Sequence, residues 1–226
     1  MNWWVTDLLH DSPVLLGSWV FWVITSITLH ELAHGYVAIK LGDDTPIHTG
    51  HMTLNPLVHM SPMALILFAL FGFTWGAMPV NPSRLRGRYG EALMSFAGPA
   101  CNAVQFVVLV IASALWVRLA RGHAGDNVLE HTFVFLSTGA MLNVVGFFFN
   151  LIPIPPLDGW RVAGDIFPRY NNIWRGEHGG IIGLIAFSVL FFYGGDFCFR
   201  LAGAVTSSAM HFAIHLLGTG GAGSPV

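Results

Sequence analysis

Long apolar runs separated by short polar stretches are the dominant pattern along this chain. Four runs are long enough to cross the hydrocarbon core of a bilayer as a helix, which takes about 20 apolar residues. They are approximately Val14–Ile39, Ala92–Leu119, Thr132–Leu151 and Ile181–Leu201. The pattern therefore predicts an all-α polytopic membrane protein.

Two further segments leave the number of spans open between four and six. The run Pro62–Val80 is apolar, but Gly72, Gly76 and Pro79 interrupt it, so it either spans or enters the membrane and returns. The run Asp158–Phe167 follows a cluster of prolines and is too short to span.

Between these runs, the stretch His48–Asn55 shows partial alternation and contains β-branched residues. Such a pattern predicts a short strand or hairpin at the membrane surface, with an ordinary surface loop as the alternative. We expect one integral-membrane domain over 1–226, with a core at 14–201 and a disordered tail at 218–226.

Composition agrees with a membrane protein, since 54% of the residues are hydrophobic and only 10% are charged. The net charge of −2 gives no indication of nucleic-acid binding. If Pro62–Val80 re-enters, seven basic residues share one side and three fall on the other, and the positive-inside rule makes the richer side cytoplasmic. The seven are Lys40, Arg84, Arg86, Arg88, Arg161, Arg169 and Arg175, and the three are Arg118, Arg121 and Arg200. If that segment spans instead, the split is six against four and the orientation reverses.

The candidate chemistry lies inside the first apolar run, in His30-Glu31-Leu32-Ala33-His34. These two histidines and the glutamate are its only ionisable side chains between Val14 and Tyr36, and such groups are costly within a membrane. On a helix, residues i and i+4 share a face, so both imidazoles can reach one metal ion while Glu31 handles a proton. The spacing is typical of zinc hydrolases.

A catalytic zinc site takes three protein ligands and leaves a fourth position for water, so a third ligand is required. Asp158 is the candidate, because it follows Asn150-Leu-Ile-Pro-Ile-Pro-Pro-Leu, where prolines end a spanning helix. Spacing alone leaves a second interpretation open, in which Asp158 is an ordinary helix N-cap.

Taken in order, these motifs resemble the site-2 protease family of intramembrane zinc metalloproteases. His30–Gly35 and the later N-x-x-P-x-P-P-L-D-G carry the resemblance, and three further motifs extend it over roughly two thirds of the chain. They are Phe96-Ala-Gly-Pro-Ala-Cys-Asn102, Gly50–Pro62, and Met78-Pro-Val-Asn-Pro82 followed by Arg84. The loop motifs match the compact prokaryotic branch, and no stretch is long enough for the PDZ domain that many relatives carry.

The resemblance implies that His30, His34 and Asp158 bind one Zn²⁺ and that Glu31 is the general base. It also implies asparagines near the metal, which makes Asn150 and Asn102 candidates for stabilising the oxyanion. For Asn102, a hydrogen bond to a neighbouring helix is an equal alternative. The chain departs from the family pattern at His51, where an arginine is more common, and at Gly76-Ala77-Met78, where a lysine is more common.

The implied activity is hydrolysis of peptide bonds in transmembrane segments, by a protein of a prokaryotic cell membrane whose site lies nearer the cytoplasm. One alternative is a zinc-binding membrane protein or pseudoprotease without hydrolysis, which leaves Glu31 unexplained. Another is a prenyl-protein protease, which generally needs a glutamate as third ligand. Here Glu91, Glu130 and Glu177 lie in no such helical motif.

Overall fold

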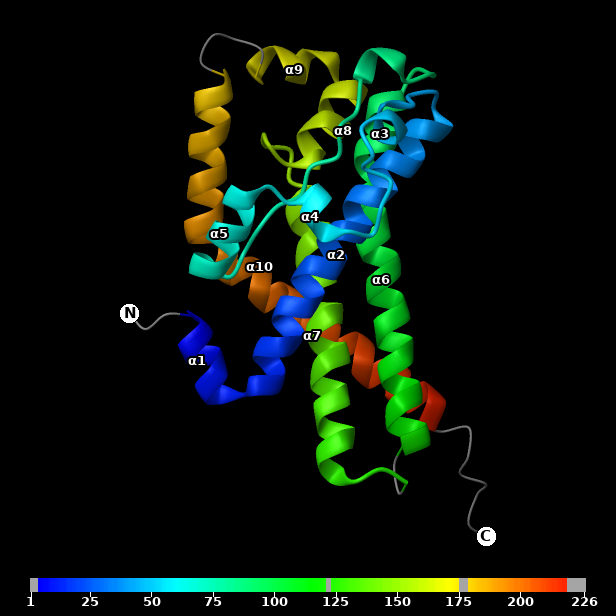
Figure 1. Cartoon of the computed structure of the whole chain (residues 1–226), viewed down its shortest axis with the longest axis vertical. Helices are drawn as coiled ribbons and strands as arrows, with labels where there is room; N and C mark the ends of the chain where they lie inside the picture. The colour runs from blue at the N-terminus through cyan, green and yellow to red at the C-terminus, as the bar shows by residue number, and fades with distance from the viewer. Residues whose placement is uncertain (1–3, 121–122, 175–178, 219–226) are drawn as a thin grey trace.

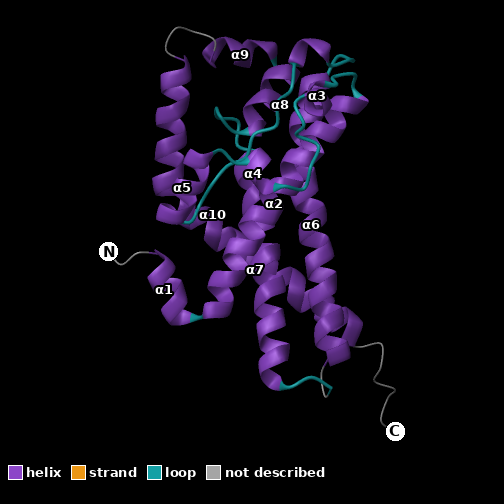
Figure 2. Cartoon of the chain, viewed as in Figure 1, coloured by secondary structure: helices purple, strands orange, loops and turns teal. Residues whose placement is uncertain are grey.

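The computed structural model describes residues 4–120, 123–174 and 179–218, and within them the chain is helical with no strand (Figure 2). Four helices are long and apolar enough to cross a membrane, which confirms the predicted all-α polytopic fold. They are α2 (Pro13–Lys40), α6 (Gly90–Ala120), α7 (Asp126–Asn150) and α10 (Gly179–Gly218). The shorter elements are α1 (Trp4–Asp11), α3 (Thr45–His48), α4 (Pro56–His59), α5 (Pro62–Phe71), η1 (Pro82–Arg84), α8 (Asp158–Ile166) and α9 (Pro168–Trp174). Of the predicted tail, residues 219–226 lie outside the described residues.

The spanning helices α2, α6 and α7 pack on one another, and α10 packs on α6 and α7 (Figure 1). An apolar cluster of Leu109, Val110, Ala140 and Met210 forms the core between α6, α7 and α10. Elsewhere the long helices expose large apolar side chains, for example Val104 on α6 and Phe192 on α10. Exposed apolar surface of this extent fits helices whose outer faces meet lipid.

Helix α10 is longer than the predicted span Ile181–Leu201, because it continues unbroken through the His211–Leu217 segment to Gly218. Figure 1 shows that it changes direction part-way and then crosses behind α7 and α6. The pair Gly194-Gly195 lies near its middle, and small flexible residues of this kind are a common site of helix bends.

The predicted strand at His48–Asn55 is wrong, because these residues form the end of α3, a turn and an irregular loop. Serine or asparagine caps followed by proline start short helices instead, as Asn55 does for α4 and Ser61 does for α5. The loop also closes on itself, since the His59 imidazole donates to the Thr53 carbonyl at 2.7 Å.

The segment 62–80 folds back rather than crossing. Helix α5 has ten residues, so it covers about 15 Å, half of a hydrocarbon core. It ends at Gly72, whose φ of +78° is the left-handed conformation that terminates helices. The chain then returns, and the Ala77 N–H donates to the His59 carbonyl at 2.9 Å. This geometry favours the re-entrant interpretation.

Candidate metal centre

Three side chains from two distant parts of the sequence meet beside α6. His30 and His34 lie one turn apart on α2, and Asp158 lies in the first turn of α8. The His30 Nε2 and Asp158 Oδ2 atoms are 3.1 Å apart, His34 Nε2 and the same oxygen 3.3 Å, and the two Nε2 atoms 3.0 Å. Both histidines are buried, and the Asp158 side chain is 19% exposed.

These separations suit a tetrahedral metal. Zinc bonds of about 2.0–2.1 Å at tetrahedral angles place neighbouring ligand atoms about 3.3 Å apart. His30, His34 and Asp158 form the group of ligand side chains in the described residues that could hold a metal ion. Two imidazoles and one carboxylate are also a ligand set found in catalytic zinc sites, with one position left for water.

Gly98 on α6 makes room for the ion. A Cβ atom added there would lie 2.4 Å from Nε2 of His30 and 2.4 Å from Nε2 of His34. That point is close to where an ion bound by both nitrogens would lie, so any side chain at this position would fill the site. The backbone of α6 thus forms one wall of the metal centre.

The second ring nitrogen of each histidine is held by a partner on α6. His34 Nδ1 lies 2.8 Å from the Met94 carbonyl, which only accepts, so this nitrogen carries the proton. His30 Nδ1 donates to Asn102 Oδ1 at 2.6 Å. Both Nε2 lone pairs are therefore available to a metal, the arrangement that outer partners of zinc-binding histidines usually enforce.

The Asn102 contact continues as a chain of hydrogen bonds through the bundle. Asn102 Nδ2 donates to Asn143 Oδ1 at 2.8 Å, and Asn143 Nδ2 donates to Ser26 Oγ at 3.0 Å. Asn143 has no exposed surface and connects α7 to both other helices. Sequence reasoning missed Asn143 and Ser26, whose one signal was a polar residue within an apolar run.

The Asp158 carboxylate faces the Nε2 atoms of both histidines and does not cap its helix. Leu157 occupies the N-cap position of α8 and makes no side-chain cap, so the capping interpretation is wrong. Burial alone would raise the pKa of the Asp158 carboxyl group, but the two imidazoles that face it outweigh burial and hold that pKa below the usual range. Asp158 is thus anionic at neutral pH, as a metal ligand must be.

Helix α8 is itself tied to α6 by two polar contacts. Arg161 donates to Glu91 at 2.9 Å, and the Ala92 N–H donates to Asp165 Oδ2 at 2.8 Å, near the start of α6. These contacts fix the position of α8, and so keep the Asp158 carboxylate close to the two histidines of α2.

Glu31 lies next to the metal group but outside it. Its side chain is 8% exposed and is covered by the returning segment after α5, where a Cβ added to Gly76 would lie 2.5 Å from Glu31 Cγ. His59, also buried, lies within electrostatic range of Glu31, and its Nδ1 has no hydrogen-bond partner. The re-entrant segment therefore encloses the glutamate.

The two asparagines expected near the metal occupy different places. Asn102 contacts His30 directly, with its amide shared between His30 and Asn143. Asn150, the last residue of α7, donates to the Gly146 carbonyl of its own helix at 3.0 Å. The structure records that bond rather than one to His30, His34 or Asp158.

Comparison with known proteins identifies the group that this centre belongs to. The chain is 38% identical over 177 residues to "Putative zinc metalloprotease YwhC" of Bacillus subtilis, an alignment covering 74% of this chain and 78% of that protein. The chain belongs to the site-2 protease family of zinc metalloproteases.

More distant site-2 protease relatives are longer than this chain. "Putative zinc metalloprotease Rip2" of Mycolicibacterium smegmatis is 34% identical over 70% of this chain and 58% of its own length. "Zinc metalloprotease MJ0392" of Methanocaldococcus jannaschii is 25% identical over 69% of this chain and 38% of its own length. No family model matches the chain, and no solved structure matches it at a significant level. The expected cofactor, zinc, and the expected metalloprotease class are both supported by these relatives.

Proposed function

We propose that this protein is an endopeptidase that cleaves transmembrane segments within the bilayer. The observation that carries the proposal is the position of His30, His34 and Glu31 on α2, a helix long and apolar enough to span. His34 lies six residues before the end of α2 at Lys40, so it lies about 9 Å from that end. Such a site would meet substrate at membrane depth.

In this proposal His30, His34 and Asp158 hold the zinc. When bound, zinc would supply Lewis acidity, lowering the pKa of water from about 15.7 towards 7 and polarising a carbonyl. Glu31 accepts a proton from the attacking water and passes it to the leaving amine nitrogen. The enclosure of Glu31 under Gly76 keeps bulk water from competing for that proton.

The asparagines take separate roles in the proposal. Asn102 orients His30, because its carboxamide is engaged by His30 and Asn143. Asn150 donates one amide hydrogen to Gly146, which leaves the other for the developing oxyanion. An oxyanion donor contributes roughly 3–4 kcal/mol in other hydrolases, so Asn150→Ala should lower kcat by about 100-fold or more.

We also propose an orientation in a prokaryotic cell membrane. Lys40 ends α2, Arg84 pairs with Asp44 directly before α3, and Arg161 pairs with Glu91 in the first turn of α6. These basic residues therefore gather where α2 ends and α6 begins, and the positive-inside rule would make that end cytoplasmic. The zinc site would then lie nearer the cytoplasmic surface.

The test is the position of the cut. Single-span peptides with a helix-breaking Gly-Pro at different depths are incubated with the purified protein in liposomes, and the products are sequenced by mass spectrometry. Cleavage inside the apolar segment supports the proposal. Cleavage restricted to flanking soluble sequence would mean a membrane-anchored protease of the ordinary kind.

A further inference from the structure

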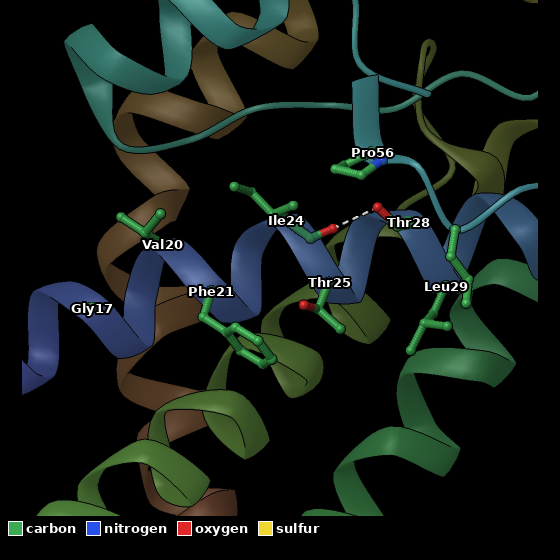
Figure 3. Close-up of a pocket in the computed structure, with 9 residues that line it drawn as sticks. Gly17, Val20, Phe21, Ile24, Thr25, Thr28, Leu29 and Pro56 are labelled. Atoms are coloured by element: carbon green, nitrogen blue, oxygen red, sulfur yellow. Dashed lines mark hydrogen bonds between the residues drawn. The ribbon is translucent and has the colours of Figure 1, made fainter. Parts of the chain in front are cut away.

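An apolar groove runs along one face of α2 and ends beside the proposed active site. Figure 3 shows its lining from Gly17 to Leu29, with Pro56, the first residue of α4, over the far end. The groove has a volume of about 630 Å³, within the range of known ligand sites. It is open at Gly17, where an added Cβ would meet no atom within 4 Å.

The groove and the packed side of α2 are opposite faces of the same helix. Trp22 and Ser26 point into the bundle, where they donate to the Phe135 carbonyl and accept from Asn143 respectively. The groove face instead carries Ile24 and Thr28. Residues three and four apart share a face, so the next residue along this face after Thr28 is Glu31. An occupant of the groove would thus be directed towards the catalytic base.

The lining determines the chemistry of the occupant. It contains no charged side chain, and its side-chain polar atoms are the hydroxyls of Thr25 and Thr28. The Thr28 hydroxyl already donates to the Ile24 carbonyl at 2.8 Å, which leaves the Thr25 hydroxyl, on the groove face, for a polar group of the occupant. The twelve helical steps from Gly17 to Leu29 give the groove a length of about 18 Å, more than half of a hydrocarbon core.

The end of the groove distinguishes a peptide from a lipid chain as its intended occupant. Leu54 and Pro56 cover α2 at Thr28, one turn before Glu31. They belong to the segment 54–59, which includes α4 and ends at His59, a residue within electrostatic range of Glu31. A peptide whose apolar part lay in the groove would be continued by a segment passing under this loop, which is where a scissile bond must lie.

We propose that this groove is the docking site for the apolar transmembrane segment of the substrate. The inference rests on the proposed function. Apolar side chains of the segment pack on Val20 and Ile24, and its chain then leads to Glu31. The groove therefore recognises a long apolar segment at membrane depth and makes no charge-specific contact with it.

The test uses the Glu31→Gln protein in phosphatidylcholine liposomes, so that no turnover is needed. A photo-crosslinking residue is placed at Val20 or Ile24, or at Val104 as a matched control on the exposed face of α6. The probe is a biotinylated single-span poly-leucine/alanine peptide with a central Gly-Pro. We expect peptide crosslinks several-fold stronger at the groove positions and competed by unlabelled peptide. Equal yields at Val104, or crosslinks to lipid alone, would overturn the proposal.

A second measurement keeps the two proposals separable. Ile24→Trp fills the groove and should raise KM about tenfold while kcat changes little, the pattern of lost binding. Zinc content should stay unchanged, and Val104→Trp should behave as wild type. Normal kinetics in Ile24→Trp would refute the docking site while leaving the protease intact. Strong groove crosslinking by a protein that cleaves no peptide would refute the protease while leaving the docking site.

Discussion

Two glycines lie against the reactive side chains. One leaves space at the metal ligands and the other leaves space at Glu31. Gly98 faces the metal-binding nitrogens of His30 and His34, whereas Gly76 faces the carboxylate side chain of Glu31. A methyl group at either position would contact its neighbour well inside van der Waals distance. Because the neighbours differ, the two alanine variants should fail in different ways.

Gly98→Ala should lose zinc. The added methyl group lies where the ion binds, so zinc affinity should fall by at least about tenfold and cleavage should fall with it. Zinc per chain is measured by mass spectrometry after dialysis against a weak chelator. The control is Gly203→Ala on α10, where the new Cβ meets no atom, and it should bind zinc normally. Full zinc occupancy in Gly98→Ala would contradict the placement of the metal.

Gly76→Ala should keep zinc and lose activity. The methyl group would displace Glu31 without touching the three ligands, so the proton acceptor moves while the metal stays. A general base contributes about 10²–10⁴-fold to rate, and we expect kcat to fall within that range. Zinc content and kcat are measured on the same preparation. Normal kcat would show that the returning segment does not position Glu31.

Asp43 makes the junction between α2 and α3 sensitive to pH. Its buried carboxylate accepts from the Thr45 hydroxyl at 2.5 Å and from the Asn81 N–H at 2.6 Å. Burial would raise the pKa of Asp43, but these hydrogen bonds outweigh burial and hold it below its usual value. Because the folded-state pKa is the lower one, the stabilisation is complete above the unfolded pKa of about 3.9 and is lost as pH falls below it.

Asp43→Asn should therefore lower stability at neutral pH, by about 1–3 kcal/mol, and should flatten its dependence on pH below about 4. Thermal unfolding in detergent between pH 3 and 7 measures both effects. Asp44→Asn is the control, because Asp44 is exposed and pairs with His48 and Arg84 at the surface, where we expect little change. Parallel pH curves for wild type and Asp43→Asn would refute this account.

At the level of whole elements, the hydrogen-bond chain Ser26–Asn143–Asn102–His30 connects the three helices of the central bundle. Each member comes from an apolar stretch, and each pair is within 3.0 Å. Buried polar chains of this kind rigidify a core when every group is satisfied. Here the chain ends on a ligand ring, so it couples helix packing to metal affinity.

Asn143→Leu should weaken zinc binding although Asn143 touches no ligand. Loss of an outer partner typically costs 10–100-fold in metal affinity, because the ring is no longer held. Zinc competition with a chromophoric chelator measures the affinity, and the d–d spectrum of the cobalt-substituted protein reports the geometry. Asn127→Leu, at an exposed position of α7, serves as control. Unchanged zinc affinity and an unchanged cobalt spectrum in Asn143→Leu would contradict the coupling.

Several elements followed from sequence because one physical signal dominated them. Long apolar runs predicted the positions of α2, α6 and α7 to within a few residues, apart from the start of α7. Exposing such a run to water is unfavourable whatever its neighbours in sequence, so the signal is local. The loop at 48–55 was predicted wrongly, because alternation over so few residues carries little information without a partner strand. The proline-capped turns and the His59–Thr53 hydrogen bond decided its conformation instead.

In the site, too, features with a local sequence signal were predictable and features that depend on tertiary packing were not. The spacing of His30 and His34 on one helix is local, so their shared face was predictable, and Asp158 came from a motif. The Asn143 contact depends on how α7 packs against α6, which no local pattern encodes. In the sequence, Gly76 marks a break in the apolar run 62–80 and a departure from a family pattern, whereas its contact with Glu31 depends on the return of the chain after α5.

At the scale of the whole molecule, the proposed water-dependent reaction takes place inside a bundle whose outer surface is largely apolar. Lys40 and the ion pairs Arg84–Asp44 and Arg161–Glu91 lie where α2 ends and α6 begins, and His34 lies six residues before that end of α2. Substrate is expected to arrive laterally, since α2 turns one face to the bundle and the other to the groove. We propose that this arrangement is a protease in which Glu31 acts on water beside a zinc held by His30, His34 and Asp158.

The most direct test measures peptide cleavage and zinc content together in wild type and Glu31→Gln. We expect wild type, in liposomes, to cleave a single-span peptide and to lose that activity when a chelator is added. Glu31→Gln should keep about one zinc per chain while kcat falls by 10²-fold or more, in line with loss of a general base. If Glu31→Gln retained activity, or if well-folded wild type bound no zinc, this protein would not be a zinc protease with Glu31 as its general base.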